Sequence, residues 1–522
     1  MSLVLNGLRK RFPHSSDYRT GDKRGHTTMN EELNKSRIED GSGGLLTRCG
    51  LLQRAAWIFP ATALLANWTR AAQEVSPVMA KLSEYMAGAR NSELPEKVVL
   101  DAKHHILDTV AAMVSGSELP PGRDAIQFAR TYGGGQKVAT VVASKTLCGP
   151  MDAAFANGEL AHADESDDDY TSGGAHPGCA VVPATLAIGE QFQISGTHFL
   201  RAVTLGYDIG MRAYKTLKGG VLTETHNLVG TMGASAASGC VAGLDVQQMR
   251  WLLDYATQQA GAGIGTWRDD IEHIEKAFLF GAMGARNGVT AALVVRSGWT
   301  GMNDVLAGPQ NFVKSYAPKA DPAKLAEDLG KRYEVSLTSI KGWTTGGPIQ
   351  SILDAIVNLR KKRPFEANDV RHVVIRSATS QAERVNKREM PDINVQYLVA
   401  VMLIDKTVSF HAAHDKARMQ DPAILREEAK VELIGDDELE KLLPTRVGVV
   451  EIDLTDGTHL TERVENARGT PENPMTREEV VAKARGLMTP VLGAATTTKL
   501  IDRLLDIDSI KNVRELRPLL QR

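Results

Sequence analysis

Cysteine is scarce in this chain: there are four in 522 residues, and none belongs to a CxxC pair. Because no three of them are spaced like a cluster either, we expect no metal site and no iron–sulfur cluster. Opposite charges nearly cancel to a net charge of −2, which excludes a bulk attraction to nucleic acid or anionic membrane. Aromatic residues make up only 5%, whereas 47 glycines, many of them within helical patterns, indicate close helix–helix contacts.

Long hydrophobic runs are also missing. The apolar run from Ala55 to Trp68 covers about 14 residues, too few for a confident membrane span, and we expect no stable membrane association. It follows the basic segment Thr47–Arg54, which resembles a twin-arginine export signal with Cys49 in place of the second arginine. We predict that 47–74 is an export signal or linker and that 1–46 is a disordered extension. The alternative is a wrongly assigned start followed by a frayed helix, which leaves localisation open between periplasm and cytoplasm.

The pattern from residue 75 to 334 predicts a helical domain. Pro95 begins one helix and Gly116 ends it, as expected for residues that start and stop helices. Several further segments are apolar on more than one face, which indicates burial by other helices within the domain or across a dimer interface. These segments lie near 151–163, 180–193, 197–215, 230–242, 246–262 and 276–297.

The character of the sequence changes after Gly330. Residues 335–340 and 369–376 alternate as strands, and a helix is predicted at 348–359. Two more strands, 447–454 and 458–464, flank a Thr-Asp-Gly turn that is typical of a hairpin.

We therefore predict a mainly α protein, in which a large all-helical domain carries a smaller α+β lid domain with antiparallel strands. The lid is predicted at 335–472, and C-terminal helices at 473–522 are predicted to rejoin the helical domain.

The segment from His162 to Glu190 is the most informative one for function. It holds five carboxylates within six residues, followed by His176 in a glycine-rich turn at the start of an apolar helix. Carboxylates this close repel one another, so some of them must gain a donor, a cation or a proton. One explanation is that this segment forms a functional site. The alternative is a solvated acidic loop. The carboxylates are Asp164, Glu165, Asp167, Asp168 and Asp169.

Three further segments, 225–234, 274–283 and 394–400, occur with this one in an order that resembles the MmgE/PrpD family. The resemblance extends from about Val75 to the C-terminus. That family includes 2-methylcitrate dehydratase, cis-aconitate decarboxylase and an iminodisuccinate epimerase. The resemblance implies a helical domain with a lid, and we expect a homodimer that acts on a small carboxylate.

The resemblance also carries individual residues over. It implies catalytic roles for four residues, which are His176, His226, Lys276 and Tyr397. It implies substrate binding by four more, which are Glu165, Asp168, Asp169 and Lys341. In this register Glu165 replaces an aspartate and Asp169 a threonine of the family pattern.

These residue types suit the removal of a weakly acidic proton next to a carboxylate. Such a step needs a placed base and cations that stabilise the developing charge. Histidines change protonation near neutral pH, lysines supply charge without a metal, and a tyrosine can donate a proton. No cofactor is required. Each residue also has a structural explanation: His176 as a turn residue, His226 as a helix cap, Lys276 and Lys341 as surface lysines, and Tyr397 as a core tyrosine.

One departure from the family pattern follows Lys341. The arginine and histidine that usually come next are absent, and the chain reads Gly-Trp-Thr-Thr-Gly-Gly-Pro up to Pro348. Together with the extra charge of Asp169, this loss predicts a less positive pocket and poor turnover of methylcitrate or cis-aconitate. Elsewhere in the lid, His411 and His414 are interpreted as surface residues.

Three functions remain open at this point. The first is a cofactor-independent lyase, a dehydratase or decarboxylase acting on a hydroxy- or unsaturated polycarboxylate. The second is an epimerase of an amino- or imino-dicarboxylate. The third is a carboxylate-binding protein without catalytic activity.

Overall fold

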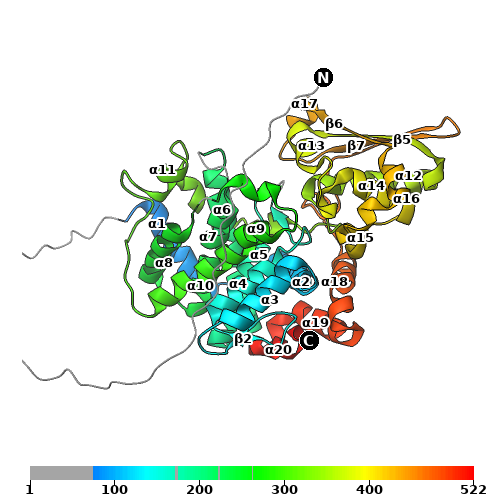
Figure 1. Cartoon of the computed structure of the whole chain (residues 1–522). Coiled ribbons are helices and arrows are strands. Elements are labelled where there is room, and N and C mark those ends of the chain that lie inside the picture. Colours follow the sequence, from blue (N-terminus) through cyan, green and yellow to red (C-terminus); the bar gives the residue numbers. More distant parts are fainter. Residues whose placement is uncertain (1–74, 171–173, 221–223, 262) are drawn as a thin grey trace, which may run out of the picture. The chain divides into compact units, whose positions relative to one another are not determined.

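The computed structural model describes residues 75–170, 174–220, 224–261 and 263–522, which belong to one compact unit, Ala71–Arg522. The predicted disordered extension and export signal, residues 1–74, lie outside the described residues. The described chain is mainly α-helical with little sheet, which confirms the predicted fold class (Figure 1).

Helices form the first part of this unit, and the predicted helix after Pro95 runs from Glu96 to Gly116. The helices in chain order are α1 Pro77–Gly88, α2 Glu96–Gly116, α3 Pro120–Tyr132, α4 Pro150–Ala161, α5 Gly178–Phe192, α6 Gly196–Leu217, α7 His226–Ala242, α8 Val246–Gln259, α9 Ile274–Ala277, α10 Met283–Arg296 and α11 Phe312–Tyr316. Two short strands, β1 Ala139–Thr140 and β2 Leu147–Cys148, pair between α3 and α4.

Helix α7 lies at the centre of this part, between α6 and α10, and every residue from Asn227 to Ala242 is buried. Its small residues let the neighbouring backbones approach. A Cβ atom built on Gly288 of α10 would lie 2.4 Å from the carbonyl carbon of Ala234, and one on Gly233 would lie 2.7 Å from the carbonyl oxygen of Gly206. The glycines therefore set the spacing of the three helices.

Helix α9, a π-helix at Phe278–Ala282 and α10 follow one another directly. The stretch Ile274–Arg296 is long and apolar enough to cross a membrane by length and composition, but 61% of its most apolar window is buried inside the protein. It packs against α7 and α4, which explains its composition as that of a core helix.

Residues 349–464, which we call the lid as a name for this part of the chain, have their own hydrophobic core around a four-stranded sheet of order β6-β5-β7-β8. The hairpin is confirmed as β7 Gly448–Leu454 and β8 His459–Val464, and the strand before it as β5 Val370–Ala378. Sequence analysis missed β6 Val431–Asp436, which pairs parallel to β5 although only antiparallel strands were predicted.

Helices α12 and α14 pack on this sheet, on the same face in Figure 1. The lid helices are α12 Gln350–Lys362, α13 Thr379–Val385, α14 Val395–Asp405, α15 Phe410–His414, α16 Pro422–Glu428 and α17 Asp437–Glu440.

The predicted strand at 335–340 is mostly wrong. Residues Glu334–Leu337 form a 3-10 turn, and only β4 Thr338–Ser339 is extended. This short strand pairs with β3 Asp169–Tyr170, so it fixes the acidic segment rather than the lid sheet. The local alternation of apolar residues reflects this small pairing.

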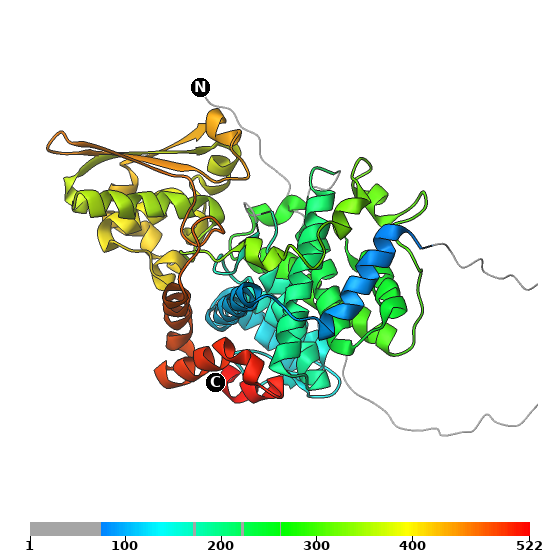
Figure 2. The same ribbon diagram turned by 180° about the vertical axis from the view of Figure 1, so that it is seen from behind.

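The chain returns to the helical part at its end. Helices α18 Arg477–Leu492, α19 Ala494–Leu505 and α20 Arg517–Leu520 contribute to the same hydrophobic core as α2, and α18 packs along α2 (Figure 2).

The close packing of α7 can be tested with one methyl group. We expect Gly288→Ala to lower the free energy of unfolding by about 1–3 kcal/mol, because the added Cβ meets backbone atoms that cannot move aside. The matched control is Gly486→Ala in α18, whose Cβ would meet nothing within 4 Å, and which should be neutral or slightly stabilising. Urea unfolding measures both, and equal stabilities of the two variants would contradict the packing argument.

Candidate active site

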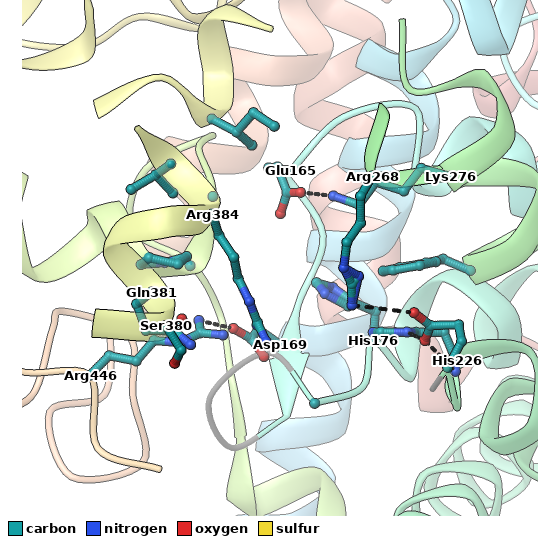
Figure 3. A pocket seen from close by; sticks show the side chains of 18 of the residues that line it. Glu165, Asp169, His176, His226, Arg268, Lys276, Ser380, Gln381, Arg384 and Arg446 are labelled. Carbon is teal, nitrogen blue, oxygen red and sulfur yellow. Dashed lines mark hydrogen bonds and ion pairs between the residues drawn. The ribbon is translucent and has the colours of Figure 1, made fainter. Parts of the chain in front are cut away.

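A cavity of about 570 Å³ opens between the helical part and the lid (Figure 3). The helical side of its wall comes from the acidic segment, the start of α7, and α9 with the π-helix. The lid side comes from residues 346–348, from α13 with the residues that follow it, and from residues 443–446 before β7. Five predicted site residues line it, which are Glu165, Asp169, His176, His226 and Lys276.

The carboxylates at 164–169 are buried, so the solvated-loop alternative is wrong. Asp168 faces away from the cavity and fixes the segment in the fold. It accepts hydrogen bonds from the Tyr207 hydroxyl at 2.5 Å and the Gly178 amide at 3.0 Å, and it lies 2.8 Å from His105 Nδ1. The structure therefore does not bring Asp168 to the cavity, because its oxygens contact residues of α2, α5 and α6.

Glu165 lies between two lysines. It pairs with Lys276 at the cavity and lies 3.1 Å from Lys341 Nζ, which also donates to the Glu165 carbonyl oxygen at 2.9 Å. Burial raises the pKa of Glu165, but the two lysines outweigh it and hold that pKa well below its usual value. Lys341 is buried behind Glu165 and does not line this cavity. It lines a smaller adjoining cavity of about 130 Å³ together with Asp169 and Arg446, and its predicted contact with substrate stays a prediction.

Asp167 orients the imidazole of His176. Its Oδ2 lies 3.4 Å from Nδ1 of His176 and 2.9 Å from Nδ1 of His162, and its other oxygen lies 3.7 Å from Lys341 Nζ. Burial raises the pKa of Asp167, yet the neighbouring histidines and Lys341 lower it well below its ordinary value. With Nδ1 turned toward a carboxylate, Nε2 is the nitrogen of His176 that is left for a ligand.

His226 begins α7 and pairs through Nδ1 with Glu224, whose second oxygen accepts a hydrogen bond from Trp267 Nε1 at 3.0 Å. Burial lowers the pKa of His226, while Glu224 opposes this shift. Within the described part of the chain, Nε2 of His226 is buried and has no partner. The centroids of the His226 and His176 rings are 5.7 Å apart, so two imidazoles can serve one ligand.

The π-helix places Phe280 among these histidines. Its ring stacks on His226 at 3.6 Å between centroids and on His162 at 4.6 Å. The adjacent Gly281 makes this possible, because a Cβ there would lie 2.1 Å from the carbonyl oxygen of Gly158. A single π turn within an α-helix is frequent at functional sites. Burial beside Phe280 lowers the pKa of His162 to about 3, which keeps that ring neutral.

Tyr397 does not belong to this cavity. Its side chain is fully buried in the lid core, and its hydroxyl donates to the carbonyl oxygen of Ala412 at 2.6 Å. The structure therefore does not bring Tyr397 together with the other predicted catalytic residues, and its burial and satisfied hydroxyl fit the alternative of a core tyrosine.

The cavity is rich in cations, while the expectation that it is less positive than in tricarboxylate-handling family members stays a prediction. Among described residues, six basic and three acidic side chains line it, in addition to the two histidines. The basic residues that sequence analysis did not assign to the site are Lys218, Arg268, Arg384, Arg388 and Arg446. Figure 3 shows Arg384 and Arg446 on the lid side, across from Lys276 and His226. These cations make the cavity compatible with a ligand that carries several carboxylates.

Asp169, the extra carboxylate of this segment, is paired with one of these cations. It accepts a hydrogen bond from Arg446 Nη1 at 2.6 Å, across 277 positions of sequence. Burial raises the pKa of Asp169, but Arg446 and the positive charges near it lower it below its usual value. The extra carboxylate thus binds a lid arginine instead of only adding negative charge.

His414 was interpreted as a surface residue, and this is wrong. Its Nε2 lies 3.0 Å from Asp164 Oδ2 and 3.9 Å from Asp392 Oδ2, so it links α15 of the lid to the acidic segment. His273 Nε2 lies 2.9 Å from the same oxygen of Asp392. By contrast, His411 of the same helix is exposed, as expected.

One group of described side chains could hold a metal ion by geometry: His162, Asp167 and His176, whose ligand atoms lie within 4.8 Å of one another. Lys341 lies beside Asp167 and already supplies it with positive charge. His162 Nδ1 is engaged with the same carboxylate. These contacts favour an internal ion-pair network over a metal centre.

The site residues that sequence analysis missed come from distant segments. Phe280 follows Lys276 by one helical turn, and this spacing could have indicated that both reach one cavity. Arg446 lies in an irregular segment before a strand, and no local pattern indicates its position.

Two family models match the chain: MmgE/PrpD N-terminal domain at residues 80–325 and MmgE/PrpD C-terminal domain at residues 343–507. A curated relative, cis-aconitate decarboxylase of Aspergillus terreus, is 25% identical over 487 residues, covering 85% of this chain and 96% of the relative. The cis-aconitate decarboxylase-like protein oryM of Aspergillus oryzae is 24% identical over 481 residues, covering 85% and 97%. Cis-aconitate decarboxylase of Homo sapiens is 24% identical over 464 residues, covering 83% and 92%.

The His414 contact predicts a pH dependence of stability. Burial lowers the pKa of His414, but its contacts with Asp164 and Asp392 raise it to about 9 from an ordinary value of 6.5. A raised pKa stabilises the fold fully below pH 6.5, and this stability is lost as pH rises through about 9. We expect wild type to lose on the order of 2–3 kcal/mol of unfolding free energy over that interval relative to His414→Gln.

The control for this experiment is His411→Gln on the same helix, which should keep the wild-type pH profile because His411 is exposed. Denaturant unfolding at intervals between pH 6 and pH 10 measures all three proteins. Parallel profiles for wild type and His414→Gln would show that the contact with Asp164 does not stabilise the fold.

Metal independence is a separate prediction. We expect dialysis against a chelator to leave ligand binding, and any turnover, unchanged, because lysines and arginines supply the positive charge of the cavity. Elemental analysis of the purified protein is the control. Loss of function that one specific divalent ion restores would overturn it.

Proposed function

We propose that this chain, which belongs to the MmgE/PrpD family, is a cofactor-independent lyase acting on a small polycarboxylate. The relatives named cis-aconitate decarboxylase support this class of reaction at 24–25% identity. Loss of carbon dioxide from an unsaturated tricarboxylate is the first reaction to test, and loss of water from a hydroxy-tricarboxylate, as in a 2-methylcitrate dehydratase, is the second.

The cation-rich cavity carries the proposal. Six basic side chains meet three acidic ones there, and two of the acidic ones, Glu165 and Asp169, are already paired with cations. A ligand with several negative charges would balance the remainder, whereas a neutral or cationic ligand would leave the excess positive charge of the cavity wall without a counter-charge. This is the pattern expected for a substrate with two or three carboxylates.

The two imidazoles suit proton transfer at the reacting carbon. Loss of carbon dioxide or abstraction of a proton leaves an electron pair on carbon next to a carboxylate, and the charge spreads into that carboxylate. Lys276 is the cation that we assign to this role, and its Nζ lies 5.4 Å from the centroid of the Phe280 ring on which His226 stacks. His226 Nε2 has no described partner and can exchange the proton with carbon, and His176 is placed to assist.

An epimerase of an amino- or imino-dicarboxylate is the second candidate, because two separate imidazoles on one cavity could act on opposite faces of a carbon. The two activities differ in their products. A lyase releases carbon dioxide or water, whereas an epimerase exchanges the proton at the stereocentre with solvent and releases neither. Binding of a polycarboxylate without either event would identify a binding protein.

The expected homodimer also stays a proposal. Exposed aromatic side chains gather around α3 and α9, where the rings of Phe128 and Phe278 both contact Phe155. Such a patch is common at subunit interfaces, and sedimentation velocity of the full chain would give the oligomeric state.

Turnover is the decisive test. We expect the full-length protein to convert cis-aconitate or 2-methylcitrate in deuterated buffer, followed by proton NMR and by release of carbon dioxide. His226→Asn and Lys276→Met should lower kcat about 100- to 10,000-fold, because each removes a group used at the reacting carbon.

The matched control is His459→Asn, a histidine on an exposed strand of the lid, which should leave kcat unchanged. Full activity of both His226→Asn and Lys276→Met would refute the assigned roles. Deuterium incorporation into an amino- or imino-dicarboxylate without loss of water or carbon dioxide would instead favour the epimerase.

A further inference from the structure

The lid side of the cavity contains an arrangement of three residues that depend on one another. Arg446 Nη1 donates to Asp169 Oδ2 at 2.6 Å, and the backbone of Gly347 lies against this pair. A Cβ atom built on Gly347 would lie 1.7 Å from Arg446 Nη1 and 2.8 Å from Asp169 Oδ2. Any larger residue at position 347 would therefore displace the ion pair.

Among the described residues, Asp169 is a partner of the Arg446 guanidinium. The guanidinium carries five N–H donors, and Asp169 takes one of them. Nε of Arg446 is buried and has no partner among the described residues. The side chain is only 14% exposed, so water compensates these donors poorly. A guanidinium held in one orientation with free donors is suited to a planar carboxylate.

A second lid arginine, Arg384, lies close by. Arg384 lines the same cavity, and within residues 75–522, leaving out the few positions not described, it makes no hydrogen bond or ion pair. Partial burial and the positive charges of Arg268 and Arg446 lower its pKa, as expected where cations gather without enough anions. In Figure 3 Arg384 extends into the cavity toward Asp169.

These groups are distinct from the reacting end of the cavity. Lys276, His176 and His226 come from the helical part, whereas Arg384 and Arg446 come from α13 and the segment before β7. We propose that Arg446 and Arg384 bind the carboxylate of the substrate that is remote from the reacting carbon. In this arrangement Asp169 is a positioning residue, and Gly347 provides the space for the ion pair.

This proposal rests on the proposed function, since it names the part of a polycarboxylate that the lid recognises. It also explains how the chain can do without an arginine and a histidine directly after Lys341. The glycines at 346 and 347 leave room, and Arg446 supplies the charge from a different segment. The specificity is for a second carboxylate at the far end, so a monocarboxylate gains nothing from it.

Binding of a non-reacting probe tests the proposal without any turnover. The probe is propane-1,2,3-tricarboxylate, measured by calorimetry at low salt, with propionate as the monocarboxylate reference. We expect Arg446→Gln to weaken tricarboxylate binding roughly 10- to 100-fold, the usual effect of losing charged hydrogen bonds. Binding of propionate should be unchanged. The control is Arg371→Gln, which changes an exposed arginine on β5 of the lid sheet. This variant should bind both probes like wild type.

Two further variants test the positioning. Gly347→Ala should weaken tricarboxylate binding as Arg446→Gln does, and the double variant should be no weaker than Arg446→Gln alone, because both changes remove one interaction. Asp169→Asn should also weaken binding if the carboxylate holds Arg446 in place. Tighter binding by Asp169→Asn would show that its charge merely repels the ligand, and would overturn its positioning role.

The outcomes separate this inference from the proposed function. If Arg446→Gln does not fold, Arg446→Lys can replace it. Lysine keeps the positive charge but lacks the paired N–H donors of the guanidinium, so this variant should still weaken tricarboxylate binding selectively. If turnover exists but KM and tricarboxylate affinity are unchanged in Arg446 variants, the lyase stands and this inference fails. If no substrate is turned over but the selective loss is measured, the inference stands and the proposed function fails.

Discussion

The burial of charge in the segment after α4 is the constraint on which the rest of the structure depends. A buried carboxylate without a partner costs several kcal/mol, roughly the margin by which a whole domain is stable. Each carboxylate of this segment therefore needs a donor from another element. Glu165 is held by Lys276 and Lys341, and Asp169 is held by Arg446. The partners come from α9, from the residues after β4 and from the lid, so satisfying the charges also assembles the site.

The same constraint couples the lid to the helical part. Asp164 pairs with His414 of α15, and Asp169 pairs with Arg446 before β7, so two carboxylates of one segment bind two different parts of the lid. Removing the lid would remove both contacts. The cavity lies next to these contacts, and its charge balance therefore depends on the lid being in place. A polycarboxylate ligand would add negative charge to the lid arginines and strengthen the same association.

Sequence reasoning located the helical side of the site well, because its residues lie in short segments with recognisable order. His176, His226, Lys276 and Glu165 all line the cavity, and crowding of like charges correctly indicated that the acidic residues would acquire partners. The hairpin was predictable from its turn. The lid side was not, because an apolar helix gives no sign of whether a tyrosine such as Tyr397 faces a cavity or a core. Nor does the sequence of an irregular segment, such as the one before β7, show which distant residue its arginine, Arg446, will contact.

The two ends of the cavity differ in polarity, and this difference suits a division of roles. Near the histidines, Phe280 covers two rings and excludes water, which favours neutral imidazoles that can accept a proton. At the lid end, arginines gather without enough anions, which favours a charged ligand group. A substrate held by its remote carboxylate at the arginines would present its other end to the apolar face. Binding energy from one end could then offset the cost of desolvating the reacting carboxylate at the other.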